Sequence, residues 1–307
     1  MIVESAPATT RLAGPFGWAL TVDVEEWYHN CQVPEYVEPA RRPRLVEELD
    51  WLLPETAEFF ARAGRTATFF VLGEVAARLP GRIRELADAG HEIASHGMHH
   101  LRALARTLRR FREDVLRSRR LLEDTVGEAV AGFRAPEWSL RHPGSAVTRI
   151  VAEAGFLYDS SLMPALGSGR LDNPRFACRL RWPDGLKILE FPPLVFAGRA
   201  QLPAGGWTGR LAHPRWIDRA AVRHADRGGL PLLVVHPWEI VDRPLPGDLT
   251  GLARFFHEAG RRGYRARFAE LLAAHPWESI RRALRGTATT TNVHRLPEDT
   301  TRSGRTR

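Results

Sequence analysis

The sequence changes from apolar to acidic within Ala19-Leu20-Thr21-Val22-Asp23-Val24-Glu25-Glu26-Trp27. Its apolar part, residues 17–22, predicts a β-strand, and the side chains of a strand alternate between its two faces. Asp23 and Glu25 therefore point the same way at the strand end, where a ligand can reach both carboxylates. Two adjacent carboxylates raise each other's proton affinity unless a cation lies between them. One acid would then bind a metal and the other would transfer protons; the alternative is a pair of solvated loop acids.

A second polar segment is His91-Glu92-Ile93-Ala94-Ser95-His96-Gly97-Met98-His99-His100, and it too follows a strand-like run. His96 and His100 are four residues apart, a spacing that can bring both imidazoles to one point. With Glu25 they form a two-histidine, one-carboxylate set that leaves coordination positions open. Zinc is the default metal, and other divalent transition metals fit. His99 is an alternative ligand, and a histidine pair at this spacing is as often structural as functional.

Apolar, β-branched runs alternate with helical spacing along the chain. We expect strands near residues 66–73, 91–95, 130–136, 156–161, 188–192 and 230–237, and helices near residues 45–63, 81–89, 107–123, 145–154, 216–227, 249–262 and 268–274. This alternation predicts a parallel α/β fold, either an open sheet or a barrel. Polar residues stand at or just after the expected strand ends, namely Asp23, Glu25, His96, Arg134, Asp159 and His236. In α/β barrels that rim carries the chemistry.

The rim residues suggest catalytic roles. Asp23 would act as general base for an attacking water, and Arg134 would pair with Asp23 and keep it ionised. His236 would be the general acid that protonates a leaving amine, and Asp159 would hold its imidazole in the right tautomer. The structural alternatives are a surface ion pair for Arg134 and a hydrogen-bonded core residue for His236.

Aromatic residues lie near the same loops and include Trp27, Tyr28, Trp138, Trp207 and Trp238. Sugar rings stack on such faces, although Trp is also a frequent core residue. We take Trp27, Trp138 and Trp238 as candidate substrate-binding residues.

Composition limits the functional classes. The 307 residues are 44% apolar, enough for a large core, and no apolar run is long enough to span a membrane. The acidic N-terminal segment lacks the features of a signal peptide, so we expect a cytoplasmic protein. Of the net charge of +8, residues 281–307 carry +5, and nearly all basic residues are arginines. This pattern favours a solvated, disordered tail over a nucleic-acid partner.

Five segments resemble polysaccharide deacetylases with a NodB-homology domain (carbohydrate esterase family four). Residues 21–25 are similar to the first motif, with base and metal carboxylate, and residues 95–100 to the metal motif. Residues 134–138 resemble the third motif, residues 158–161 the fourth, and residues 234–239 the last, which holds the acid histidine. The similarity extends over roughly residues 17–275. Its opening and closing motifs resemble the subgroup associated with exosortase and exopolysaccharide gene clusters.

The resemblance implies an α/β fold, a distorted (β/α) barrel of the NodB type with fewer than eight strands. It also implies metal-dependent hydrolysis of N-acetyl groups on the amino sugars of a polysaccharide, such as an exopolysaccharide or its precursor. The metal, zinc by default, would be held by Glu25, His96 and His100. We expect a flexible leader over residues 1–14, one catalytic domain over residues 15–280 and a basic disordered tail over residues 281–307.

The sequence departs from the family pattern at three points, one of which is the absence of the Trp that is usual after the fourth-motif Asp, here Asp159. The usual adjacent Asp-Asp reads Asp23-Val24-Glu25, which makes the metal carboxylate a glutamate and leaves Glu26 as the other candidate. Glu137 stands where a small residue is usual, and it would repel acidic glycans or bind an amine product. Two further functions stay open, namely deacylation or deformylation of a small molecule on the same scaffold and non-catalytic glycan binding. The sequence predicts no oligomeric state.

Overall fold

The computed structural model describes residues 6–29, 47–105, 107–241 and 251–285 of the chain. Within these residues ten strands form one sheet in the order β1-β7-β8-β6-β5-β4-β3-β2-β10, and β9 also pairs with β2. The strands are β1 (Ala8–Arg11), β2 (Trp18–Val24), β3 (Thr68–Val71), β4 (Glu92–Ser95), β5 (Gly132–Phe133), β6 (Tyr158–Asp159), β7 (Cys178–Arg181), β8 (Lys187–Glu190), β9 (Leu232–Val235) and β10 (Trp277–Glu278).

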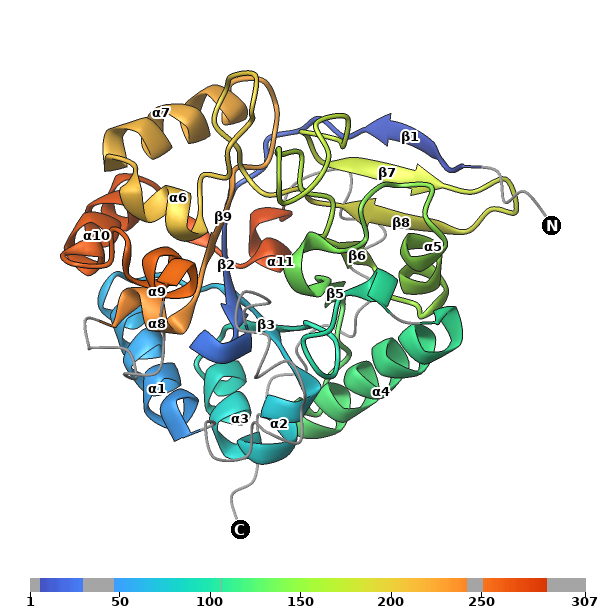
Figure 1. Cartoon of the computed structure of the whole chain (residues 1–307), viewed down its shortest axis with the longest axis horizontal. Helices are drawn as coiled ribbons and strands as arrows, with labels where there is room; N and C mark the ends of the chain where they lie inside the picture. The colour runs from blue at the N-terminus through green and yellow to red at the C-terminus, as the bar shows by residue number, and fades with distance from the viewer. Residues whose placement is uncertain (1–5, 30–46, 106, 242–250, 286–307) are drawn as a thin grey trace, which may run out of the picture.

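Seven of the described strands form a continuous parallel run, β9-β2-β3-β4-β5-β6-β8, that curves around the middle of the molecule (Figure 1). The run does not close as a sheet, although the amide of Leu194, just after β8, donates to the carbonyl of Leu232 in β9 at 2.9 Å. The expected distorted barrel with fewer than eight strands is confirmed by this run. The short β10 is parallel to the start of β2, whereas β1 and β7 are antiparallel additions beyond β8.

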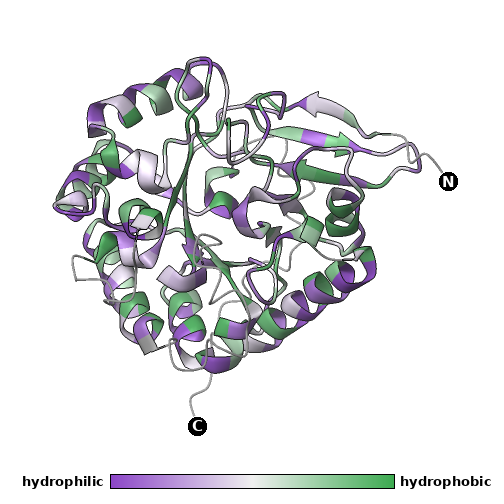
Figure 2. Ribbon diagram, in the orientation of Figure 1, coloured by the Kyte–Doolittle hydropathy of each residue, from purple (hydrophilic) through white to green (hydrophobic). Residues whose placement is uncertain are grey.

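Helices surround the parallel run on its outer side (Figure 1). They are α1 (Glu47–Arg62), α2 (Gly73–Arg78), α3 (Pro80–Asp88), α4 (Leu108–Val126), α5 (Ala146–Glu153), α6 (Gly206–Leu211), α7 (Pro214–Ala225), α8 (Pro237–Ile240), α9 (Gly251–Glu258) and α10 (Tyr264–Ala274). The short α11 (Ile280–Ala283) lies instead inside the curve of the strands. Figure 2 shows β2, β3 and β9 as largely hydrophobic, and outer helices such as α4 and α7 as mixed in hydropathy. Among the described helices, none has the length and apolarity needed to cross a bilayer.

Helix α4 illustrates how local sequence sets these elements. The side chain of Thr107 accepts a hydrogen bond from the amide of Arg110 and caps the first turn. Gly127 ends the helix at φ 75°, a left-handed conformation that glycine adopts without strain. Phe111, Val115 and Leu122 lie on the buried face between these caps. Their spacing gives one apolar face toward the sheet.

Two apolar clusters lie on the two faces of the strands. Leu20, Val22 and Val24 of β2 belong to the cluster shared with the surrounding helices. Ala19 belongs to the other cluster, which the strands enclose and which includes Ile280 of α11. Thr21 and Asp23 alternate with the first group and share the second face, so the base candidate points into the barrel.

The structure corrects two of the expected boundaries. Residues 8–11, expected in a flexible leader, form β1 and pair with β7. The expected domain end at residue 280 falls inside α11, whose Ile280 and Ala283 are buried, so the ordered domain continues to residue 285. The remaining tail, residues 286–307, lies outside the described residues. Strand β7 and helix α6 also lie within residues 163–182 and 197–214, two segments for which the sequence predicted neither a strand nor a helix.

Candidate active site

Four of the predicted site residues directly follow strands. Glu25 comes after β2, His96 after β4, Arg134 after β5 and His236 after β9. Because these strands are parallel neighbours in the sheet, their carboxyl ends meet at one rim. The local sequence thus delivers all four side chains to the same place.

The Glu25 carboxylate lies between two imidazoles. Its Oε1 atom is 2.8 Å from Nε2 of His96 and 2.8 Å from Nε2 of His100. Burial disfavours the charged carboxylate, but His100 and the other neighbouring imidazoles outweigh burial and hold the pKa of Glu25 well below its usual value. The expected two-histidine, one-carboxylate set is therefore assembled, with its ligand atoms within 4.8 Å of one another.

The chemistry of these donors fits a divalent cation. Nδ1 of His96 lies 2.8 Å from the carbonyl oxygen of Arg134, an acceptor, so Nδ1 carries the proton. In the neutral imidazole Nε2 then presents a lone pair to Glu25 Oε1, which is also an acceptor. Two acceptors facing each other at a buried site are the arrangement that a cation satisfies.

The loop that carries the histidines is anchored from two helices. The amides of Gly73 and Glu74, at the start of α2, donate to the carbonyls of Gly97 and Met98. Asp114 of α4 accepts from the amide of Met98 at 2.8 Å. Gly97 has φ 79°, which allows the turn that returns His100 toward His96.

The alternative ligand candidates make other contacts. Glu26 accepts from the amide of Leu49 at 2.9 Å, on the side of α1, and burial raises its pKa well above the usual value. His99 lies 3.3 Å from Glu74 instead of facing Glu25. Asp23, Glu25 and His236 also bring ligand atoms within 4.8 Å, but Asp23 is held by Arg134 and His236 by Glu239.

Arg134 and Asp23 form a buried ion pair, the pairing that the sequence predicted. Nη1 of Arg134 lies 2.5 Å from Oδ1 of Asp23 and 2.9 Å from the hydroxyl of Thr21. Its other nitrogens donate to the carbonyl and hydroxyl of Ser160, and its guanidinium lies 4.0 Å from the ring centre of Phe70. This fixed cation keeps Asp23 in one orientation at the floor of the site.

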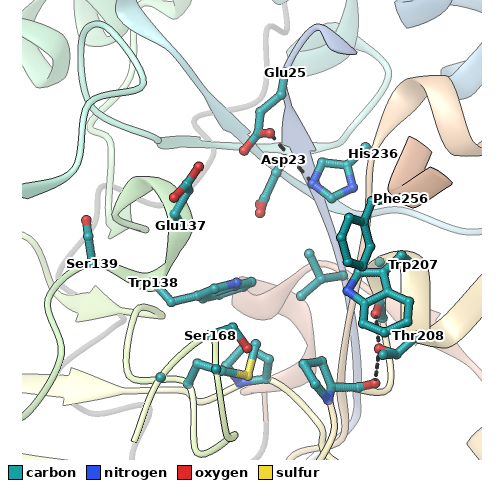
Figure 3. A pocket seen from close by; sticks show the side chains of 18 of the residues that line it. Asp23, Glu25, Glu137, Trp138, Ser139, Ser168, Trp207, Thr208, His236 and Phe256 are labelled. Atoms are coloured by element: carbon teal, nitrogen blue, oxygen red, sulfur yellow. Dashed lines mark hydrogen bonds and ion pairs between the residues drawn. The ribbon is translucent and has the colours of Figure 1, made fainter. Parts of the chain in front are cut away.

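His236 faces the cavity with Nε2 and the protein interior with Nδ1. Nε2 is 3.8 Å from Oε2 of Glu25, an approach drawn as a dashed line in Figure 3. Nδ1 lies 2.9 Å from Oε2 of Glu239, which also accepts from the His236 amide at 2.8 Å. Burial opposes the charged imidazole, but the Glu239 carboxylate outweighs it and raises the pKa of His236 to about 9.

The expected role of Asp159 is wrong. Its carboxylate is completely buried, accepts from the hydroxyl of Ser161 and adjoins Glu190. Burial raises the pKa of Asp159 to about 6. The place at His236 Nδ1 belongs to Glu239, a residue that the sequence reasoning missed. Its spacing, three residues after a helix N-cap, is that of a capping box and could have revealed it.

A cavity of about 450 Å³ opens beside these groups, and Glu137, Trp138 and Trp238 line it as expected. In Figure 3, Trp138 stands on one side and Trp207 with Phe256 on the other. Glu137 has φ 52° and Trp138 φ 55°, left-handed conformations that cost free energy in non-glycine residues and cluster at functional sites. The Glu137 carboxylate accepts from Arg102 at 2.6 Å.

Trp27 does not line this cavity, so its assignment to substrate binding is wrong. Its side chain is 1% exposed, and it packs edge-on against Tyr28 with ring centres 5.6 Å apart. A large apolar ring next to a strand end is more stable in the core than at a wet rim. Trp207 and Phe256 instead supply aromatic surface from α6 and α9.

Comparison with known proteins agrees with this architecture. A polysaccharide deacetylase family model matches residues 51–157, and a domain of unknown function (DUF3473) matches residues 160–285. A solved structure from Mycobacterium smegmatis, assigned as a polysaccharide deacetylase, superposes with a TM-score of 0.57 at 23% identity over 91% of each chain. At that identity the similarity supports the fold alone.

Two curated relatives match part of the chain. A peptidoglycan deacetylase of Helicobacter pylori is 30% identical over 111 residues, 36% of this chain and 37% of that protein. A chitooligosaccharide deacetylase of Sinorhizobium fredii is 37% identical over 84 residues, 27% of this chain and 39% of that protein. The chain thus spans well under half the length of either relative. This chain therefore resembles polysaccharide deacetylases over residues 51–157 and the DUF3473 domain over residues 160–285.

Proposed function

We propose that the chain is a metal-dependent hydrolase that removes N-acetyl groups from the amino sugars of a polysaccharide, such as an exopolysaccharide or its precursor. The observation that carries the proposal is the arrangement at one rim of a base candidate paired with arginine, a donor set for a divalent cation and an acid candidate. The activities of the two curated relatives, deacetylation of peptidoglycan and of chitooligosaccharides, support the reaction class.

A divalent cation, zinc by default, held by Glu25, His96 and His100 supplies Lewis acidity when bound. Asp23 accepts a proton from the attacking water, and Arg134 holds that carboxylate in one orientation. The water oxygen bonds to the acetyl carbonyl carbon, and the carbon–nitrogen bond then breaks. His236 donates a proton from Nε2 to the departing amine, so that the products are acetate and the free amino sugar.

The cavity walls suit a pyranose substrate. Trp138 and Trp207 offer ring faces on opposite sides, and sugar rings pack on such faces through their C–H groups. Glu137 and Arg102 add hydrogen-bonding groups at the rim. An extended glycan can therefore lie across the mouth while one acetamido group reaches Asp23 and His236.

The experiment that tests the proposal is acetate release from N-acetylated oligosaccharides by the wild type and by Asp23→Asn. We expect the variant to retain its metal, measured by elemental mass spectrometry, and to lose turnover by about 10²-fold or more. Normal turnover in Asp23→Asn would overturn the base assignment. Release from small N-acyl compounds but not from oligosaccharides would replace the polymer substrate by a small molecule.

A further inference from the structure

Two buried charged side chains, Glu239 and Arg210, form a hydrogen-bonded row with His236. Glu239 accepts from His236 with Oε2, and its other oxygen, Oε1, accepts from Nη1 of Arg210. Arg210 is 1% exposed and Glu239 2% exposed. Burial disfavours the charged carboxylate, but Arg210 and His236 together hold the pKa of Glu239 at about 2. The three side chains therefore form one ordered row that ends at the cavity.

Further contacts hold the Arg210 side chain in this row. Its Nε donates to the carbonyl of Ala259 at 3.0 Å, and Nη2 donates to the carbonyl of Phe256. Its guanidinium also lies 5.0 Å from the ring centre of Trp238. One cation thus joins α6, α8 and the end of α9 to the acid histidine.

Stability alone is a weak reason for such a row. Removing two charges from water is expensive, and apolar residues of similar volume often stabilise a fold as well as a buried ion pair does. What the row supplies is orientation. A carboxylate at Nδ1 and at the backbone amide fixes the ring, so that Nε2 is the nitrogen that faces the cavity.

We propose that Glu239 and Arg210 are the positioning residues of the acid histidine, and that this support is a task of the DUF3473 half of the chain. His236, Glu239 and Arg210 all lie within residues 160–285, whereas the base and the metal donors lie in residues 23–100. The proposal rests on the proposed hydrolase function. In this proposal the second half of the chain delivers the proton to the leaving group.

Protonation of the leaving group gives the proposal a specific readout. An amide cannot expel its amine without a proton, so misorientation of His236 slows amide cleavage. An aryl acetate ester expels a phenolate that needs no proton, while it still requires the base and the cation site. Loss of positioning therefore affects the two substrates differently, whereas loss of folding affects both equally.

The test compares turnover on an N-acetylated oligosaccharide and on an aryl acetate for the wild type and Glu239→Gln. Glutamine replaces one of the two carboxylate oxygens by an NH2 group, which cannot accept a hydrogen bond, so either Arg210 or His236 loses its acceptor. We expect oligosaccharide turnover to fall by about 10²-fold or more and aryl acetate turnover to change less than about threefold. The KM for oligosaccharide should stay near the wild-type value.

Two further variants keep the result interpretable. The pair Arg210→Met with Glu239→Gln leaves no unpaired buried charge and so preserves folding, yet it should retain the selective defect. Glu92→Gln removes another buried carboxylate at the amino end of β4, and any loss there should be equal on both substrates. Melting temperature and metal content report folding and site integrity.

The outcomes separate the two proposals. An equal loss on both substrates in folded Glu239→Gln, or full recovery of oligosaccharide turnover in the double variant, would overturn the positioning role. A metal-loaded wild type that cleaves neither substrate would instead refute the hydrolase function.

Discussion

Arg134 contacts His96 through its backbone carbonyl and Asp23 through its side chain. Its carbonyl oxygen lies 2.8 Å from Nδ1 of His96, and its guanidinium lies 2.5 Å from Oδ1 of Asp23. A single residue at the end of β5 thus orients both His96, the proposed metal ligand, and Asp23, the proposed base. The two roles can be separated, because a side-chain substitution removes only the second contact.

Arg134→Met should therefore leave metal binding intact and abolish turnover. Removal of the guanidinium leaves Asp23 buried and unpaired, which should lower the free energy of unfolding by about 3–5 kcal/mol. Chemical denaturation and elemental mass spectrometry measure the two effects. Adding Asp23→Asn to this variant should restore part of the stability and none of the activity; an additive further loss would argue against the pair.

The cation site predicts a contrast between two histidines of one loop. His96→Ala should bind less than about one tenth of the wild-type metal, because a lost ligand or its partner commonly costs 10- to 100-fold in affinity. His99→Ala is the matched control, since His99 faces Glu74 and should leave the metal content unchanged. Chelation of the wild type should stop acetate release, and added Zn²⁺ should restore it. Equal metal content in the two variants would sink the assignment.

The strand ends were predictable because they depend on local pattern. The runs before Glu25, Arg134 and His236 are largely apolar, the short run before His96 contains Ile93 and Ala94, and parallel strands bring such ends to one rim. The burial of Asp159 and Trp27 was not predictable from the sequence, because it depends on which distant side chains fill the interior. Strand β7 likewise depends on pairing with β1, which is remote in sequence, as well as with the nearby β8. Arg210 has no local pattern that distinguishes it from the chain's many surface arginines.

Trp138, which lines the cavity, and Trp27, which does not, should respond differently to truncation. Trp138→Ala should raise the KM for oligosaccharide about threefold to tenfold, because it removes a sugar-facing ring worth about 1 kcal/mol. Trp27→Ala should lower the free energy of unfolding by about 3–5 kcal/mol, because it opens a core cavity. The folded Trp27→Ala variant should keep the wild-type KM for oligosaccharide. Steady-state kinetics with denaturation curves test both, and a raised KM in Trp27→Ala would return that residue to the binding site.

A histidine far from the rim should make stability depend on pH. His91 precedes β4, and its Nδ1 accepts a hydrogen bond from the amide of Ala67 at 3.1 Å, which requires a neutral ring. Burial, and secondarily the charge of Arg282, lowers the pKa of His91 from 6.5 to about 4. Between these values the unfolded chain binds the proton and the folded chain does not. The stabilisation is therefore complete above pH 6.5 and is lost as the pH falls toward 4.

His91→Asn is the matched variant, since its amide oxygen can still accept from Ala67 but does not titrate. Between pH 7 and pH 4.5 the wild type should lose about 2 kcal/mol more of its free energy of unfolding than the variant. Urea denaturation at both pH values measures the difference, with other titrating groups common to both proteins. His224, whose pKa burial also lowers to about 4, contributes equally to each and cancels. Parallel losses in wild type and variant would show that His91 is protonated in the folded state, and the hydrogen bond from Ala67 could then not exist as described.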